Sequence, residues 1–182
     1  MFLKISSALL GAAVGLALSA SEPVYTFSDK STSDWFIVDD GVMGGLSQGH
    51  FESTDEGHSR FWGDVSLENN GGFSSVRFRQ NPVDMTPYGS FKLNVKGDGK
   101  DYQFRVKSSS KEYYSYIYTF STSGEWEEIE IPFDQMVPSF RGRLLNQPPF
   151  PGEVCAEMAF LIANKKAESF SIELKEIQVV KK

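Results

Sequence analysis

The sequence contains one cysteine and two histidines in 182 residues, and it has no Asn-x-Ser/Thr sequence. A single cysteine excludes an internal disulfide, so a hydrophobic core must hold the chain together. The chain is long enough, because a domain of about 150 residues buries roughly two-thirds of the surface that its unfolded chain exposes. Cys155 lies among Val154, Ala156 and Met158, which predicts a buried small side chain.

Basic residues are also scarce, with 18 lysines and arginines against 24 acidic residues, and the formal net charge is −6. Proteins that bind phosphate backbones carry an excess of positive charge. The composition therefore predicts that nucleic acid is not a partner.

Long apolar runs are missing except at the N-terminus, where Lys4 precedes the apolar stretch Ile5–Leu18. Small residues follow at the spacing that a signal peptidase reads. The run is too short for a comfortable transmembrane span. We therefore predict a signal peptide over residues 1–20 and a mature domain over residues 21–182 that does not itself span a membrane. The predicted location is the periplasm, the extracellular space or a secretory lumen.

No later segment has a sustained helical period, and short alternating runs are instead separated by Gly, Pro, Asn and Asp about every ten residues. The predicted strands cover residues 35–39, 60–66, 73–79, 91–96, 101–107, 113–120, 126–131, 157–163 and 170–180. Stacking two sheets covers this many strands without helices. The fold class predicted is all-β, an antiparallel double-sheet jelly roll.

Two details of the strand pattern give sharper expectations. Gly-Asp-Gly at residues 97–99 separates two alternating runs, which predicts a tight hairpin because glycine supplies a positive φ. In the last strand, the apolar residues before and after Lys175 differ in phase by one residue. A β-bulge near Lys175 would return both groups to the same face.

The densest motif begins where a strand ends at Asp39 and Asp40 and continues into Gly-Val-Met-Gly-Gly, with Met43 at its centre. No Gly-Lys-Ser/Thr follows, so this is not a phosphate loop. One interpretation is a partner-binding loop with Met43 at its tip. The other is a tight connection whose carboxylates accept hydrogen bonds from backbone amides.

A second motif, Glu68-Asn69-Asn-Gly-Gly-Phe73, is a strong turn signal that leads into a strand carrying Arg77 on its polar face. Arg77 is either a bidentate clamp for a carboxylate or a structural partner of Glu68 or Asp40. The two glycine-rich loops together form the expected contact surface, with Met43 and Phe73 as its apolar anchors.

Four aromatic residues alternate along one strand, Tyr114, Tyr116, Tyr118 and Phe120, and so share one face. Such a ladder would stack on sugar rings if its face is open. If its face points inward, the same rings fill the core of a β-sandwich.

The sequence shows none of the usual catalytic patterns. It has no Gly-x-Ser-x-Gly elbow, and adjacent carboxylates such as Asp39 and Asp40 point to opposite faces of a strand, so they cannot flank one glycosidic bond. His50 and His58 lie in what reads as a solvated loop, without the convergent third ligand that a metal requires. We predict no enzyme activity, no metal and no cofactor.

Several of these motifs together resemble the complex I intermediate-associated protein 30 family. The resemblance covers roughly residues 25–180 in the family's order, with motifs at Trp35, Val38, 39–47, 61–66, 68–77, 96–99, Trp126, 131–133 and 140–142. It implies a galactose-binding-like jelly roll. Its eukaryotic members are chaperone-like assembly factors for the membrane arm of respiratory complex I and are not known as enzymes.

Those assembly factors work in the mitochondrial matrix, whereas this chain begins with a predicted export signal. The function predicted is therefore a non-catalytic, chaperone-like or accessory binding domain for a protein partner, with a membrane or envelope complex as one candidate. The alternative is an exported carbohydrate-binding module that uses the tyrosine face and Arg77 to hold a glycan.

Overall fold

The computed structural model describes residues 20–27 and 32–182, and it does not describe the side chains of Thr32, Val42 and Met43. The predicted signal peptide thus lies almost wholly outside the described residues. None of the helices within the described residues is long and apolar enough to cross a membrane.

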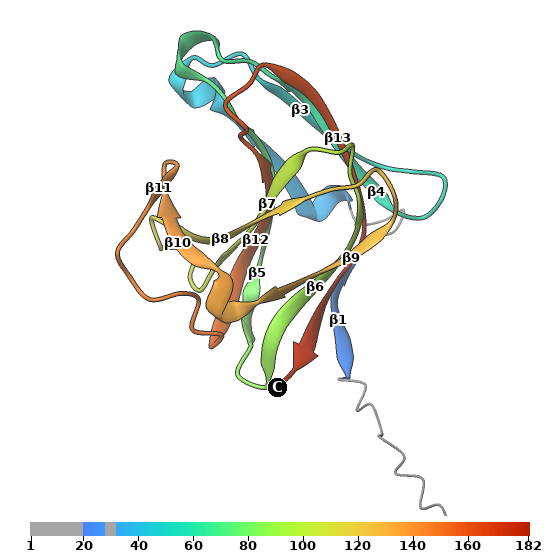
Figure 1. Ribbon diagram of the computed structural model, residues 1–182, viewed down its shortest axis with the longest axis vertical. Helices are drawn as coiled ribbons and strands as arrows, with labels where there is room; N and C mark the ends of the chain where they lie inside the picture. The colour runs from blue at the N-terminus through green and yellow to red at the C-terminus, as the bar shows by residue number, and fades with distance from the viewer. Residues whose placement is uncertain (1–19, 28–31) are drawn as a thin grey trace, which may run out of the picture.

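The described chain forms two antiparallel sheets that face each other (Figure 1). The strands are β1 (Ser21–Thr26), β2 (Trp35–Asp39), β3 (Gln48–Ser53), β4 (Ser59–Val65), β5 (Ser74–Asp84), β6 (Tyr88–Lys96), β7 (Asp101–Lys107), β8 (Ser115–Ser121), β9 (Glu127–Pro132), β10 (Val137–Phe140), β11 (Arg143–Leu144), β12 (Val154–Ile162) and β13 (Glu168–Lys181). Four short 3-10 helices connect them: η1 (Thr32–Asp34), η2 (Asp40–Met43), η3 (Glu68–Asn70) and η4 (Phe133–Gln135). The all-β jelly roll predicted from the sequence is confirmed.

The six-stranded sheet has the order β3-β4-β13-β6-β9, and the long strand β13 also pairs with β1. The seven-stranded sheet has the order β11-β10-β8-β7-β12-β5-β2. All nine predicted strands are present, with ends shifted by a few residues. Strands β1, β3, β10 and β11 were not predicted from the sequence, and β3 shows that His50 belongs to a strand and not to a loop.

The core lies between the two sheets because one face of each strand is apolar. Phe91, on β6, and Phe104, on β7, are both fully buried and meet across the sandwich with ring centroids 5.2 Å apart. Cys155 is buried as predicted. With no disulfide available, the two apolar faces supply the main driving force for folding.

The predicted hairpin at residues 97–99 is wrong, although its glycines are needed. β6 and β7 belong to different sheets, so this segment carries the chain from one sheet to the other. Gly99 has a φ of 82°, as expected for a turn. A Cβ on Gly97 would lie 2.3 Å from Oγ1 of Thr122, so the crossing also requires the absence of a side chain.

The predicted bulge is confirmed. The pairing of β13 with β6 shifts its register between Leu174 and Glu176, which leaves Lys175 unpaired in that ladder. Leu174 before the shift and Ile177 after it are both fully buried. The extra residue therefore keeps both halves of the longest strand facing the core.

We predict that Phe91→Ala lowers the free energy of unfolding by about 3–5 kcal/mol, because it deletes a fully buried ring that packs on Phe104. Urea unfolding followed by tryptophan fluorescence measures the change. Val83→Ala is the control, since Val83 is 37% exposed and its truncation should cost less than about 1 kcal/mol. Equal losses in the two variants would contradict this description of the core.

Candidate functional site

Asp40 is almost fully buried at 2% exposure and accepts hydrogen bonds from two different loops. Its Oδ1 accepts from the amide of Ser47 at 3.1 Å, and its Oδ2 from the hydroxyl of Ser47 at 2.5 Å. Oδ2 also accepts from the amides of Gly72 at 2.6 Å and Phe73 at 3.2 Å. One carboxylate thus joins the β2–β3 connection to the β4–β5 connection.

Asp39 makes a similar link between the sheets. Its Oδ2 accepts from the amide of Gly49 on β3 at 3.0 Å, and its Oδ1 from the hydroxyl of Ser74 on β5 at 2.6 Å. A Cβ on Gly49 would lie 2.2 Å from the Ser74 hydroxyl, and one on Gly45 would lie 2.1 Å from Oδ1 of Asp40. The interpretation in which these acids bond to backbone amides fits both aspartates.

The hydrogen bonds of Asp40 also set its titration. Burial raises the pKa of a carboxyl, but the bonds from Ser47, Gly72 and Phe73 outweigh that effect and lower the pKa of Asp40 from its ordinary value. A carboxyl with a lowered pKa in the folded state stabilises the fold above its unfolded pKa. That contribution is lost as the pH falls through the folded pKa.

The other predicted loop residues lie around this link. Asn69 donates from Nδ2 to the carbonyl of Gly44 at 3.0 Å, which ties the two loops a second time. Glu68 is exposed and Phe73 is half-buried. The side chain of Met43 lies outside what the structure describes, so its predicted role as an anchor stays a prediction.

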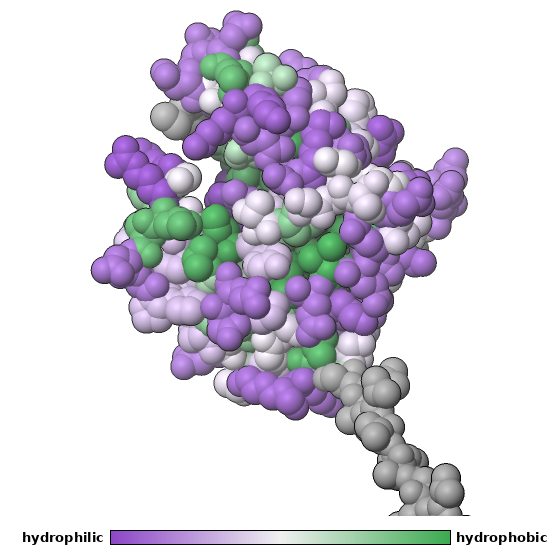
Figure 2. Space-filling view, viewed as in Figure 1, coloured by the Kyte–Doolittle hydropathy of each residue, from purple (hydrophilic) through white to green (hydrophobic). Residues whose placement is uncertain are grey.

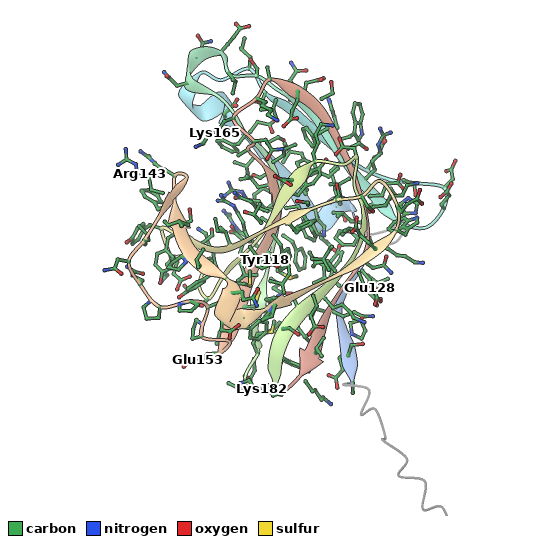
Figure 3. The ribbon with its side chains drawn as sticks, in the orientation of Figure 1. Tyr118, Glu128, Arg143, Glu153, Lys165 and Lys182 are labelled. Atoms are coloured by element: carbon green, nitrogen blue, oxygen red, sulfur yellow. The ribbon has the colours of Figure 1, made fainter. Side chains whose placement is uncertain are left out.

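The tyrosine ladder, which consists of Tyr114 and the alternating residues of β8 that follow it, faces the core. Tyr116 is 7% exposed and Phe120 is 5% exposed, and the half-buried Tyr114 and Tyr118 pack against the same cluster. Figure 3 shows Tyr118 inside the body of the sandwich. Burial and a hydrogen bond between the hydroxyls of Tyr114 and Tyr116 raise the pKa of Tyr116. The interpretation as core residues therefore fits the ladder better than that of an open stacking face.

The outer face of the seven-stranded sheet carries a row of residues that the strand register places side by side. The row consists of Phe36 on β2, Arg77 on β5, Ala159 on β12, Arg105 on β7 and Ile117 on β8. Glu157, Ala159 and Leu161 of β12 point to this face, yet each is at most 4% exposed. We call Arg77, Arg79, Arg105 and Glu157 the arginine cluster.

Glu157 is the only carboxylate that the described residues place in the arginine cluster. Arg79 pairs with it closely, at 2.9 Å from Nε to Oε2, and also stacks on Phe36 at 5.0 Å. Arg77 reaches it only at 4.0 Å and donates from Nε to the hydroxyl of Ser75 at 3.1 Å. The suggested pairing of Arg77 with Glu68 or Asp40 is therefore wrong.

Arg105 has no carboxylate partner among the described residues. Gln103 accepts from its Nε at 3.0 Å and from its Nη2 at 2.6 Å. Burial, aided by the positive charge of Arg77, lowers the pKa of Arg105 to about 10. Arg79 follows Arg77 by two residues on β5, so alternation along that strand already predicts that the two share a polar, positive face. Nothing in the sequence points to Arg105, because its proximity to Arg77 depends on the pairing of β5 and β7 with β12.

Figure 2 shows the molecule hollowed on one side, between the lobe that carries η2 and η3 and the lobe formed by β10 and β11. In Figure 1, β7, β8 and β12 run between these lobes. Figure 3 shows Arg143 at the tip of the β10–β11 lobe. Exposed apolar side chains occur on both lobes: Leu46 and Leu67 on the first, and Val137, Phe140 and Leu144 on the second.

A cavity of about 410 Å³ lies near the ends of β5 and β7 and the start of β12, lined among others by Gln80, Ser108, Tyr116 and Glu153. Within the described residues, no group of three or more His, Cys, Asp or Glu side chains is placed to hold a metal ion. His50 instead stacks on Trp62, and the buried His58 pairs with Glu173 at 2.6 Å.

Comparison with known families matches residues 25–174 to the model described as Complex I intermediate-associated protein 30. The chain belongs to this family. An uncharacterized protein of Schizosaccharomyces pombe is 33% identical over 129 residues, which cover 60% of this chain and 59% of the relative. The chain thus matches about three-fifths of that curated relative's length.

Solved structures share the fold at low sequence identity. A family 11 carbohydrate-binding module from Clostridium thermocellum, in complex with a β-1,3-1,4-mixed-linked tetrasaccharide, superposes with a TM-score of 0.64 at 15% identity, over 88% of this chain and 95% of that chain. A family 29 carbohydrate-binding module gives a TM-score of 0.53 at 13% identity, over 88% and 91% of the two chains. At this identity, the similarity establishes the fold alone.

We predict that Asp40→Asn lowers the free energy of unfolding at neutral pH by about 2–4 kcal/mol, because the amide cannot accept all four hydrogen bonds. The free energy of unfolding of the wild type should decrease as the pH drops below about 4, and that of the variant should decrease less over the same range. Urea unfolding across a pH series measures both effects. The exposed Glu68→Gln is the control, and a variant as stable as this control would contradict the structural role of Asp40.

Proposed function

We propose that the mature chain is a non-catalytic binding domain that docks a protein partner on the outer face of its seven-stranded sheet. The observation that supports this most is the composition of that face. Three guanidinium groups share this face with the carboxylate of Glu157, which pairs with two of them, and exposed apolar residues lie on both lobes. Protein interfaces are enriched in arginine and in large apolar side chains.

The flanking apolar residues add a second argument. Leu144 is 67% exposed and Val137 is 38% exposed, and both lie on the β10–β11 lobe. Exposed apolar groups that gather beside a charged face mark interaction sites more often than single scattered ones do. Membership of a family described as complex I intermediate-associated also favours a protein partner, here an accessory or chaperone-like role.

With the predicted export signal, the proposal puts that partner in the envelope, outside the cell or in a secretory lumen. A membrane complex with a surface in such a compartment is the partner class that agrees with both the family and the predicted signal peptide. The domain would then contact the complex from outside the bilayer.

A carbohydrate ligand is the second candidate, favoured by the fold shared with carbohydrate-binding modules. The tyrosine ladder faces the core, so a sugar ring would need another platform. Tyr113 is 60% exposed and packs edge-on against Phe140 at 5.1 Å. This pair lies where β8 begins and β10 ends, and it offers an open aromatic face.

The protein-partner proposal is tested by crosslinked capture from native membrane and envelope fractions, with identification of the recovered proteins. Leu144→Asp should abolish recovery of a defined partner, because it places a charge on an exposed apolar contact. Trp126→Asp is the matched control, since Trp126 is 40% exposed and borders the other sheet. Both variants should melt within a few degrees of the wild type. Equal recovery by both variants would overturn the proposed face.

The carbohydrate candidate is tested by titrating the domain with soluble mixed-linked β-glucan while intrinsic fluorescence is recorded. A saturable change that disappears in Tyr113→Ala, with Tyr118→Phe as the conservative control, would support it. A flat titration with the wild type would remove this candidate.

A further inference from the structure

Two arginines face each other across a small residue on the outer face of the seven-stranded sheet. Arg77 on β5 and Arg105 on β7 both pair with Ala159 of β12, which lies between them. Neighbouring strands are about 4.8 Å apart, so the two backbones are separated by roughly 10 Å. Ala159 has only a methyl group to fill this gap, and the two long side chains rise on either side of it.

Both arginines retain unused donors. An arginine has five N–H donors, and the described part of the chain engages only Nε and Nη2 of Arg105, both through Gln103. Arg77 donates from Nε to the hydroxyl of Ser75, and its Nη1 lies 4.0 Å from Oε1 of Glu157. Within the described residues, Nη1 of Arg105 and both Nη groups of Arg77 therefore make no close hydrogen bond and can donate to an acceptor that enters between the two side chains.

The charge of the pair is poorly compensated by the protein. Glu157 forms its close ion pair with Arg79, at 2.9 Å between Oε2 and Nε. Arg105 is half-buried and has no carboxylate partner among the described residues. Removing a charge from water without a counter-charge costs stability. An arrangement of this kind is characteristic of a site whose counter-charge arrives with a ligand.

We propose that Arg77 and Arg105 bind the carboxylate of an acidic side chain in the protein partner. This inference rests on the proposed function and specifies which chemical group of the protein partner the docking face recognises. Guanidinium groups hold carboxylates through paired, charge-assisted hydrogen bonds. Glu157 competes with the ligand, because its Oε1 already lies at the edge of the same site.

An acidic peptide fits this face better than an acidic sugar. Phe36, the ring that the strand register places beside Arg77, is covered by the guanidinium of Arg79 at 5.0 Å and therefore offers little stacking surface. The exposed Leu144 and Val137 suit apolar side chains next to the acidic one. The partner segment therefore combines at least one Asp or Glu with neighbouring apolar residues.

The test measures binding of a fluorescein-labelled octaglutamate peptide to the mature domain at low salt by fluorescence polarisation, with octaglutamine as the uncharged probe. Arg105→Met keeps the length of the side chain and removes its charge, and it should weaken octaglutamate binding by about tenfold or more. Its melting temperature should equal or exceed that of the wild type, because an uncompensated charge is removed. Arg60→Met, on the outer face of the six-stranded sheet, is the control and should bind as the wild type does.

A second pair of variants tests the competing carboxylate. Glu157→Gln should strengthen octaglutamate binding several-fold. The glutamine side chain has nearly the same shape as the glutamate but carries no negative charge to repel the incoming carboxylate. Glu128→Gln changes the net charge by the same amount on the six-stranded sheet, where Glu128 pairs with Lys92, and should have little effect. If the two variants behave alike, binding follows net charge and the proposed site is wrong.

The remaining outcomes separate this inference from the proposed function. No octaglutamate binding, or binding unaffected by Arg105→Met, would overturn the arginine site, while Leu144-dependent partner capture would still support the docking face. If oligogalacturonate binds in an Arg105-dependent way and octaglutamate does not, the carboxylate comes from a sugar and the acidic-peptide proposal fails. Loss of partner capture in Arg105→Met, with the melting temperature retained, would support both.

Discussion

The adjacent carboxylates of Asp39 and Asp40 determine how the two sheets are joined. β2 belongs to the seven-stranded sheet and β3 to the six-stranded sheet, so the chain crosses between them after Asp39, and it crosses back between β4 and β5. Asp40 accepts hydrogen bonds from both crossings, and Asp39 bonds to β3 and β5. Buried acceptors with several charge-assisted bonds are among the strongest polar contacts in a protein. The two carboxylates thus fix both crossings at one corner of the sandwich.

This link explains why the two glycine-rich motifs have their composition. Gly45 and Gly71 lie so close to the Asp40 carboxylate that a Cβ would overlap it, and Gly49 lies equally close to the Ser74 hydroxyl. The glycines make room for the acids, and the acids satisfy the amides of the loops. The motifs that connect the chain to its family therefore build the fold directly. The partner surface proposed above is the arginine cluster, which shares only Arg77 with these motifs.

The sequence predicted the features that depend on local pattern and missed those that depend on pairing. Alternation located nine strands, and a change of phase located the bulge at Lys175. Glycines at residues 97–99 indicated a turn, but turn chemistry does not distinguish a hairpin from a crossing between sheets. Alternation along its strand predicts that Arg77 lies on a polar face. Nothing local connects it to Arg105, which lies 28 residues further along the chain. Only the shared pairing with β12 brings the two together.

The distribution of charge also bears on which partner can approach. The chain as a whole is negative, at −6, and repels an acidic partner at most of its surface. The arginine cluster reverses the sign locally, with three guanidinium groups and one carboxylate on one face. Complementary potentials of this kind orient a partner during encounter and disfavour wrong orientations. If the proposed docking face binds a protein, its positive charge on a negative domain would orient the partner, whereas the apolar lobes alone would accept many partners.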